Sequence, residues 1–156
     1  MKQIVCMKWG QVYSADYVNR LYRMIARNIT PPFKLYCLTD DPAGIDPAVE
    51  TRPCPMLDLP RHMKYGGWRK VSLWANEVAD LKGECLFLDL DIIITGSLDD
   101  FFTYPGQSDY MVMRNYTTMD RRIGNTSIFR FVVGSHPEVL ERLLSDPQAM
   151  RDTYSN

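Results

Sequence analysis

The sequence predicts an α/β fold in which helices flank a mostly parallel, Rossmann-like sheet. Apolar runs at 3–7 and 34–38 have the length and composition of buried strands. The segment between them spaces its apolar residues as a helix does, and a strand–helix–strand unit implies parallel strands joined by a right-handed crossover. The third observation is the run Cys-Leu-Phe-Leu-Asp-Leu-Asp-Ile-Ile-Ile at 85–94, whose nearly continuous apolar character predicts a strand covered on both faces.

The other elements follow from turn residues and periodicity. Ser14 is the expected N-cap of the first helix, which runs to about Asn28 before Pro31-Pro32 prevents continuation. A short strand is expected at 49–52, a loop at 54–67, a helix at 68–81 and a helical turn at 97–102. Two further strands are expected at 110–113 and 127–133. The last helix is opened by Ser135-His136-Pro137-Glu138, and a polar tail follows Asp146-Pro147.

Composition limits the class of protein. The 156 residues predict a single domain over 1–156, and 46% hydrophobic with 24% charged residues is a globular composition. The net charge is −1, without a basic stripe, so nucleic acid is not an expected partner. The short polar start and the lack of a long apolar run predict no signal peptide and no transmembrane segment, hence a cytoplasmic protein. The four cysteines form no C-x-x-C pair and are expected to be buried, reduced thiols.

Asp89 and Asp91 are the main candidates for chemistry. Carboxylates two residues apart on an extended chain point to the same side, where they repel each other and attract a divalent cation. The expected position is the carboxyl end of a central strand, where open α/β sheets bind ligands. A solvated acidic strand end, or structural salt bridges, would give the same pattern without a metal.

The strand with these two acids resembles the D-x-D strand of GT-A fold nucleotide-diphospho-sugar transferases, in the manner of glycosyltransferase family 8. The nearest resemblance is to a group of bacterial glycosyltransferases, and it covers nearly the whole chain. The stretches that carry it are Tyr17-Val18-Asn19-Arg20-Leu21-Tyr22, Cys37-Leu38-Thr39-Asp40-Asp41-Pro42, Trp68-Arg69-Lys70, Leu86-Phe87-Leu88-Asp89-Leu90-Asp91-Ile92-Ile93-Ile94 and Gly124-Asn125-Thr126-Ser127-Ile128-Phe129-Arg130-Phe131.

The resemblance implies a metal-dependent transfer of a sugar from a nucleotide diphosphate donor to a hydroxyl acceptor. Asp91 would ligate Mn²⁺ or Mg²⁺, and Asp89 would contact the ribose of the donor, the metal, or both. Lys70 and Arg69 would face the nucleotide or the donor sugar, a place where a cation suits a diphosphate. A solvated face at the start of a helix explains these two cations equally well.

Three further residues are candidates for binding the donor. The resemblance places Asn125 at the donor sugar and Asp40 near the base, and Lys8, at the end of the first strand, could line the same pocket. Asn125 and Asp40 are also ordinary turn residues. The sequence offers no general base, so no catalytic residue is predicted. Family 8 implies retention at the anomeric carbon, but the residues themselves do not predict the stereochemistry of the transfer.

One departure from the family concerns the carboxyl-terminal side of the chain. Family members continue further and supply a histidine to the metal site and much of the acceptor pocket, whereas no histidine follows Leu144. The chain is then a truncated piece, or water or another subunit completes the metal site. An uncovered sheet would expose apolar surface and favour homo-oligomers.

Two alternatives to the transferase remain. The first is a truncated, non-catalytic module that binds a nucleotide sugar. The second is a haloacid-dehalogenase-like phosphohydrolase, in which Asp89 would be the nucleophile; the isoleucines after Asp91 stand where that class has a small Gly-Thr turn. The identity of the acceptor, whether glycan, lipid-linked or protein, is left open.

Overall fold

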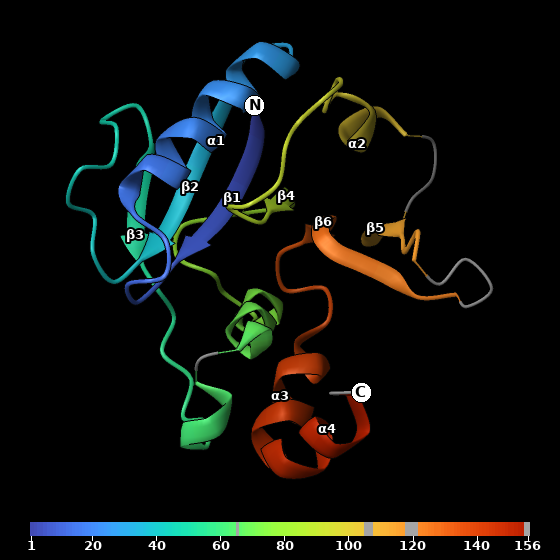
Figure 1. The fold of residues 1–156 in the computed structure, drawn as a ribbon. Helices are drawn as coiled ribbons and strands as arrows, with labels where there is room; N and C mark the ends of the chain where they lie inside the picture. The colour runs from blue at the N-terminus through green and yellow to red at the C-terminus, as the bar shows by residue number, and fades with distance from the viewer. Residues whose placement is uncertain (65, 105–107, 118–121, 155–156) are drawn as a thin grey trace. The chain divides into compact units, whose positions relative to one another are not determined.

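A computed structural model describes residues 1–64, 66–104, 108–117 and 122–154. The chain forms two compact units, Met1–Cys54 with Gly83–Val132 and Pro55–Lys82 with Val133–Asn156. Figure 1 shows the elements of both units as a ribbon. Among the described residues, no helix is both long enough and apolar enough to cross a membrane.

The first unit is built on a six-stranded sheet with the order β3-β2-β1-β4-β6-β5. β3, β2, β1 and β4 run parallel, whereas β6 pairs antiparallel with both β4 and β5. The predicted α/β fold with a mostly parallel sheet is therefore confirmed. The strands are β1 (Lys2–Lys8), β2 (Phe33–Thr39), β3 (Glu50–Pro53), β4 (Glu84–Leu88), β5 (Tyr110–Arg114) and β6 (Gly124–Val132).

Helix α1 (Ala15–Asn28) covers one face of β1 and β2 (Figure 1). Val18, Leu21 and Ile25 recur at three- and four-residue spacing and are completely buried in the core. Burial of such a stripe contributes more to helix stability than intrinsic propensity does. Ser14 occupies the N-cap position as predicted, but its side chain makes no capping hydrogen bond.

All four cysteines are buried and free, as predicted. Cys6 and Cys37 face each other across β1 and β2. The hydrogen bond to Cys37, together with burial, raises the pKa of Cys6 well above its ordinary value, and burial raises the pKa of Cys85 to about 12. Both thiols are therefore protonated at neutral pH and resist oxidation and alkylation.

The second unit contains the 3₁₀-helices η1 (Arg61–Met63) and η2 (Gly67–Trp74) and the helices α3 (Pro137–Ser145) and α4 (Pro147–Tyr154). Its core gathers Leu59, Met63 and Leu143. α3 ends at Ser145, so the predicted break at Asp146-Pro147 is confirmed. The polar tail after it forms a further helix as far as Tyr154, which Asp146 caps by accepting a hydrogen bond from the Ala149 N–H at 3.0 Å.

The predicted helix at 68–81 is also wrong. η2 ends at Trp74, Ala75 is extended, and Ala79 has a φ of +48°, in the left-handed region that a right-handed helix cannot contain. Val78 and Leu81 are nevertheless buried. The apolar spacing correctly identified buried side chains, but they pack from an irregular backbone.

The helix at Pro137 begins one residue later than predicted. His136 rather than Ser135 is the N-cap, and Pro137 stands in the first turn, where its missing N–H costs nothing. The Glu138 carboxylate pairs with His136 Nδ1 at 3.0 Å. This contact replaces the expected capping box.

Asp99, directly before α2 (Asp100–Thr103), contacts both the α1–β2 loop and β1. Its carboxylate accepts hydrogen bonds from the Thr30 backbone N–H and hydroxyl, at 3.1 and 2.7 Å, and pairs with Lys2 at 2.8 Å. The bond from Lys2 is the largest cause, followed by those from Thr30, and together they lower the pKa of Asp99 from 3.8 to about 2.

We expect Asp99 to make stability depend on pH in the acid range. The folded pKa lies below the unfolded one, so the stabilisation is fully present above about pH 4 and is lost as the pH falls towards about 2. In urea titrations at successive pH values, Asp99→Asn should therefore be less stable than the parent at neutral pH, with the difference closing through this window. Asp58→Asn, at an exposed position, is the matched control and should show no such convergence. A constant difference at all pH values would contradict the assignment.

Candidate functional site

The carboxyl ends of β1, β2 and β4 meet at one edge of the sheet because these strands are parallel. From β1 the chain passes through α1 to β2 on one side, whereas β4 pairs with the other side of β1. The strand order therefore reverses its direction of growth between β1 and β4. In open α/β sheets the crevice at such a switch point is where ligands bind.

Asp89 and Asp91 follow β4 at this edge. The Asp89 N–H donates to the Ser127 carbonyl at 2.9 Å, which extends the pairing with β6 by one residue. Leu90 is 6% exposed and belongs to the core, whereas Asp89 is partly exposed and Asp91 is exposed. The buried leucine between them fixes the chain at the point where the two carboxylates leave the sheet.

The predicted strand through Ile94 is too long. β4 ends at Leu88, and Leu90 and Asp91 form a turn rather than two more strand residues. Ile92 and Ile94 pack on the α1 side of the core, whereas Ile93 is 82% exposed. The isoleucines are therefore apolar because they cover the core along a loop, and their presence does not extend the sheet.

Tyr13, in the loop between β1 and α1, joins this site. Its hydroxyl donates to Asp91 Oδ2 at 2.8 Å, and its ring meets Tyr17 edge-on with centroids 4.8 Å apart. The hydrogen bond to Asp91 is the main reason that the pKa of Tyr13 is raised, and the negative charges of both Asp91 and Asp89 contribute. The hydrogen bond therefore joins the β1–α1 loop to Asp91, one of the two predicted metal ligands.

Tyr13 was missed from the sequence. The available indication was an aromatic residue directly before the N-cap Ser14, in the loop that leaves the carboxyl end of β1. That pattern is equally typical of a residue that packs against the first turn of a helix.

Lys8 and Asp40 lie at the ends of β1 and β2, as predicted. Lys8 is only 4% exposed, and its ammonium donates to the Asp41 carbonyl at 3.1 Å. The Asp40 carboxylate accepts the Gly10 N–H at 3.0 Å and so holds the β1–α1 loop. A buried ammonium is costly unless it is well paired, and one carbonyl is a weak partner for a full charge. Lys8 is therefore a cation suited to an anionic group at this edge.

Asn125 lies near the amino end of β6, which comes to the same edge because β6 is antiparallel to β4. Its side-chain oxygen accepts the Ser127 N–H at 3.0 Å. At Gly124, a β-carbon would stand 2.6 Å from Val112 Cγ1, so a larger residue fits there only if the Val112 side chain on β5 moves. The close pairing of these strands fixes the backbone that presents Asn125.

Arg69 and Lys70 belong to η2 in the second unit. The Arg69 guanidinium contacts Met56 Sδ at 3.8 Å. A role for either cation at the carboxylates of the first unit stays a prediction.

The capacity of the site for a metal rests on two carboxylates. Within the described ranges, no group of three or more His, Cys, Asp or Glu side chains could hold a metal ion. Carboxylate oxygens are nevertheless the ligands that Mg²⁺ and Mn²⁺ prefer, and Mg²⁺ commonly uses one or two of them together with water and substrate phosphates. Asp89 and Asp91 fit that kind of incomplete site.

The sheet order and its flanking helices define the GT-A fold of glycosyltransferases, as comparison with solved structures shows. No protein-family model matches the sequence, and no curated protein matches it. The chain is similar to the galactosyltransferase LgtC in complex with donor and acceptor sugar analogues, with a TM-score of 0.66, 12% identity, and coverage of 98% of this chain and 65% of LgtC.

A second similar structure is the glycosyltransferase GlyE of Streptococcus pneumoniae TIGR4. Its TM-score is 0.65 at 14% identity, with coverage of 98% of this chain and 40% of GlyE. The present chain therefore spans about two fifths of GlyE and just under two thirds of LgtC.

Proposed function

We propose that this protein is a metal-dependent glycosyltransferase of the bacterial family 8 kind, which moves a sugar from a nucleotide diphosphate donor to a hydroxyl acceptor. The observation that carries the proposal is the position of Asp89 and Asp91. They follow β4 at the switch point of a GT-A sheet, and Asp91 accepts the hydroxyl of Tyr13 at 2.8 Å.

Each residue of the site has a proposed part in donor binding. Asp91 and Asp89 would hold Mn²⁺ or Mg²⁺, which supplies charge neutralisation at the departing diphosphate. Lys8 and Asn125 would orient the donor from β1 and β6, and Asp40 would shape the pocket through its bond to Gly10. Arg69 and Lys70 are the candidates for a second contact with the diphosphate.

The proposed setting is the cytoplasm, with a nucleotide sugar as donor and a glycan, lipid-linked or protein acceptor. Nucleic acid is not proposed as a partner, because the net charge is −1. Homo-oligomers are proposed as a means of completing the site. The alternative of a non-catalytic module that binds a nucleotide sugar is favoured by one observation, the two-carboxylate metal site.

Metal removal tests this function. The purified chain is incubated with UDP-, GDP- and ADP-sugars and Mn²⁺, and release of the nucleoside diphosphate is followed by chromatography. We expect release from one class of donor, its loss in excess EDTA, and its return when Mn²⁺ is restored, because both carboxylates need the cation to accept a diphosphate. Metal-dependent binding of UDP without release would favour the non-catalytic module. Release that is indifferent to EDTA would contradict metal dependence.

A further inference from the structure

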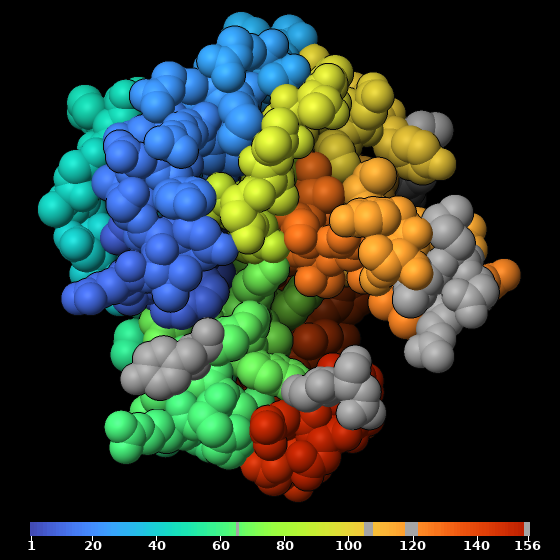
Figure 2. Space-filling view, in the orientation of Figure 1, coloured from blue at the N-terminus to red at the C-terminus, as the bar shows by residue number. Residues whose placement is uncertain are grey.

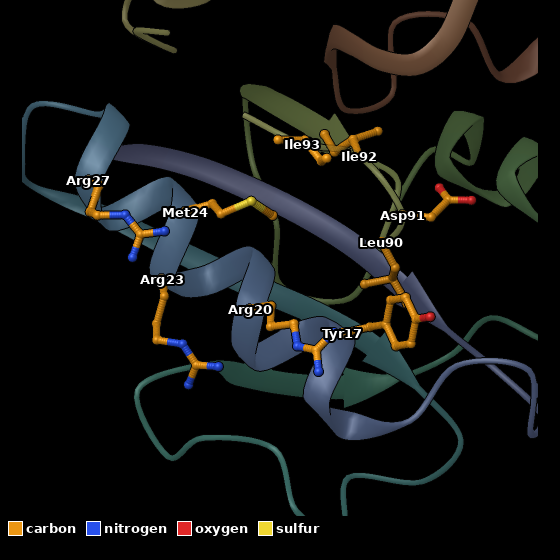
Figure 3. Close-up of a pocket in the computed structure, with 9 residues that line it drawn as sticks. All are labelled: Tyr17, Arg20, Arg23, Met24, Arg27, Leu90, Asp91, Ile92 and Ile93. Atoms are coloured by element: carbon orange, nitrogen blue, oxygen red, sulfur yellow. The ribbon is translucent and has the colours of Figure 1, made fainter. Parts of the chain in front are cut away.

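A groove of about 370 Å³ runs along the first unit between α1 and the segment after β4. Figure 2 shows that segment lying beside α1 on the visible face of the molecule. In Figure 3, Tyr17 and Asp91 lie at one end of the groove and Arg27 at the other. The groove therefore begins at the proposed metal ligand and leads away from it.

Three arginines line the groove from the same helix. Arg20, Arg23 and Arg27 project from successive turns of α1 (Figure 3). Their spacing of three and four residues makes neighbours of like charge, which is unfavourable for an isolated helix. Seven residues of helix place the first and last of them about 10.5 Å apart along the axis. This row is the strongest local concentration of charge in the groove.

The positive charge of the row is not compensated within the described part of the chain. Arg20 lies over the Tyr17 ring, 5.9 Å from its centroid, and neither Arg23 nor Arg27 forms a hydrogen bond or ion pair there. The Asp91 carboxylate, which also lines the groove, accepts the hydroxyl of Tyr13. Arg27 is explained by its place in the last turn, where the helix dipole favours a cation. The dipole does not account for Arg20 and Arg23, which lie before the last turn.

The chemistry of the lining indicates the class of ligand. Guanidinium groups bind phosphate oxygens through paired N–H donors, and they are preferred to lysine where that planar geometry matters. Met24, Ile92 and Ile93 provide an apolar side against which a carbon chain or sugar ring can pack. The volume lies in the range of pockets for small ligands. A concave site of this size suits a discrete phosphate group better than the flat surface of a membrane.

We propose that this groove binds a phosphate or diphosphate ester carried by the acceptor and so holds the acceptor beside the donor. The proposal rests on the proposed sugar transfer, since it names the acceptor of that reaction. The groove shares Asp91 with the metal site, whereas Lys8, Asp40 and Asn125, the candidates for donor binding in this unit, do not line it. An acceptor phosphate would thus be held near the donor diphosphate by arginines that have no proposed part in donor binding.

Binding of inorganic pyrophosphate in excess EDTA tests the groove. The chelator removes any contribution of a metal–diphosphate site, so the result does not depend on whether the proposed transfer is correct. We expect calorimetric titration to show salt-sensitive binding. Arg23→Gln/Arg27→Gln should raise the dissociation constant about tenfold or more, because two charge-assisted hydrogen-bonding groups are lost.

The matched control is Arg142→Gln/Arg151→Gln, which removes the same charge from exposed positions on α3 and α4. It should bind pyrophosphate as the parent does. Equal weakening in both double variants, or no binding by the parent, would overturn the proposal. Sedimentation with phosphatidylglycerol vesicles is the second arm. Arginine-dependent binding to vesicles without binding of pyrophosphate would also overturn it, in favour of contact with a membrane.

Discussion

Asp91→Asn is expected to remove metal-dependent binding of UDP. Changes to residues that only support a metal ligand lower metal affinity roughly 10–100-fold, and loss of the ligand itself should lower it further. The substitution keeps the size of the side chain and an oxygen that can accept the Tyr13 hydroxyl, now 2.8 Å from Oδ2. It removes the negative charge, which is what a hard divalent cation requires of its ligand. Titration of UDP with and without Mn²⁺ measures the effect.

Two variants separate the proposed metal role from loss of local structure. Tyr13→Phe breaks the hydrogen bond but leaves the carboxylate, so it should retain metal-dependent binding with a smaller change in affinity. Asp109→Asn removes an exposed carboxylate between α2 and β5 and should bind UDP as the parent does. If Asp91→Asn bound UDP and Mn²⁺ unchanged, Asp91 would not be a metal ligand and the proposed function would lose its main support.

The parallel half of the sheet could be predicted because its strands are long apolar runs and α1 has a clear stripe. Those patterns arise because the apolar side chains are buried: Leu21 of α1 and Leu35 of β2 lie in the same core. The antiparallel strands β5 and β6 were located from similar runs. The pairing of β6 with β4 depends on contacts across more than forty residues, such as Phe87 with Phe129, which no local pattern specifies.

Two of the errors, the helix predicted at 68–81 and the strand predicted through Ile94, have a common physical cause. Apolar residues indicate burial, but burial does not fix the backbone that achieves it. Val78 and Leu81 are buried from an irregular segment, and Ile92 covers the core from a loop. In each case the spacing was correctly identified as core-facing and wrongly assigned to a regular element.

The site was predictable to the extent that it lies at strand ends. Lys8, Asp40 and Asp89 stand where parallel strands stop, so their gathering at one edge follows from topology alone. The bond between Tyr13 and Asp91 joins residues 78 positions apart. It depends on how the β1–α1 loop closes, which the order of the strands does not determine.

Arg130 is a charged residue buried in the sheet, and its contribution to the free energy of unfolding can be tested. It is 4% exposed on β6, between the register partners Leu86 and Met111. Its guanidinium donates to the Ser108 carbonyl at 3.0 Å and pairs with Glu84 at 3.1 Å, while Nε has no hydrogen-bond partner among the described residues. The Glu84 side chain is 48% exposed. The buried Arg130 guanidinium therefore depends on the ion pair more than the half-exposed Glu84 carboxylate does.

We expect Glu84→Ala to destabilise the protein by about 2–3 kcal/mol, because it leaves a buried guanidinium without its counter-ion. Arg130→Met should change the free energy of unfolding by no more than about 1 kcal/mol, since methionine fills a similar apolar volume and the half-exposed carboxylate returns to water. Urea denaturation of both single variants and of the double variant completes the cycle.

The double variant distinguishes the possible origins of the effect. If the cost of Glu84→Ala comes from the stranded charge, adding Arg130→Met should recover most of the lost stability. If the Glu84 carboxylate stabilises the start of β4 through other contacts, the double variant should remain as unstable as Glu84→Ala alone. A larger loss for Arg130→Met than for Glu84→Ala would show instead that the guanidinium stabilises the protein through its other contacts, such as the hydrogen bond to the Ser108 carbonyl, against the expectation stated above.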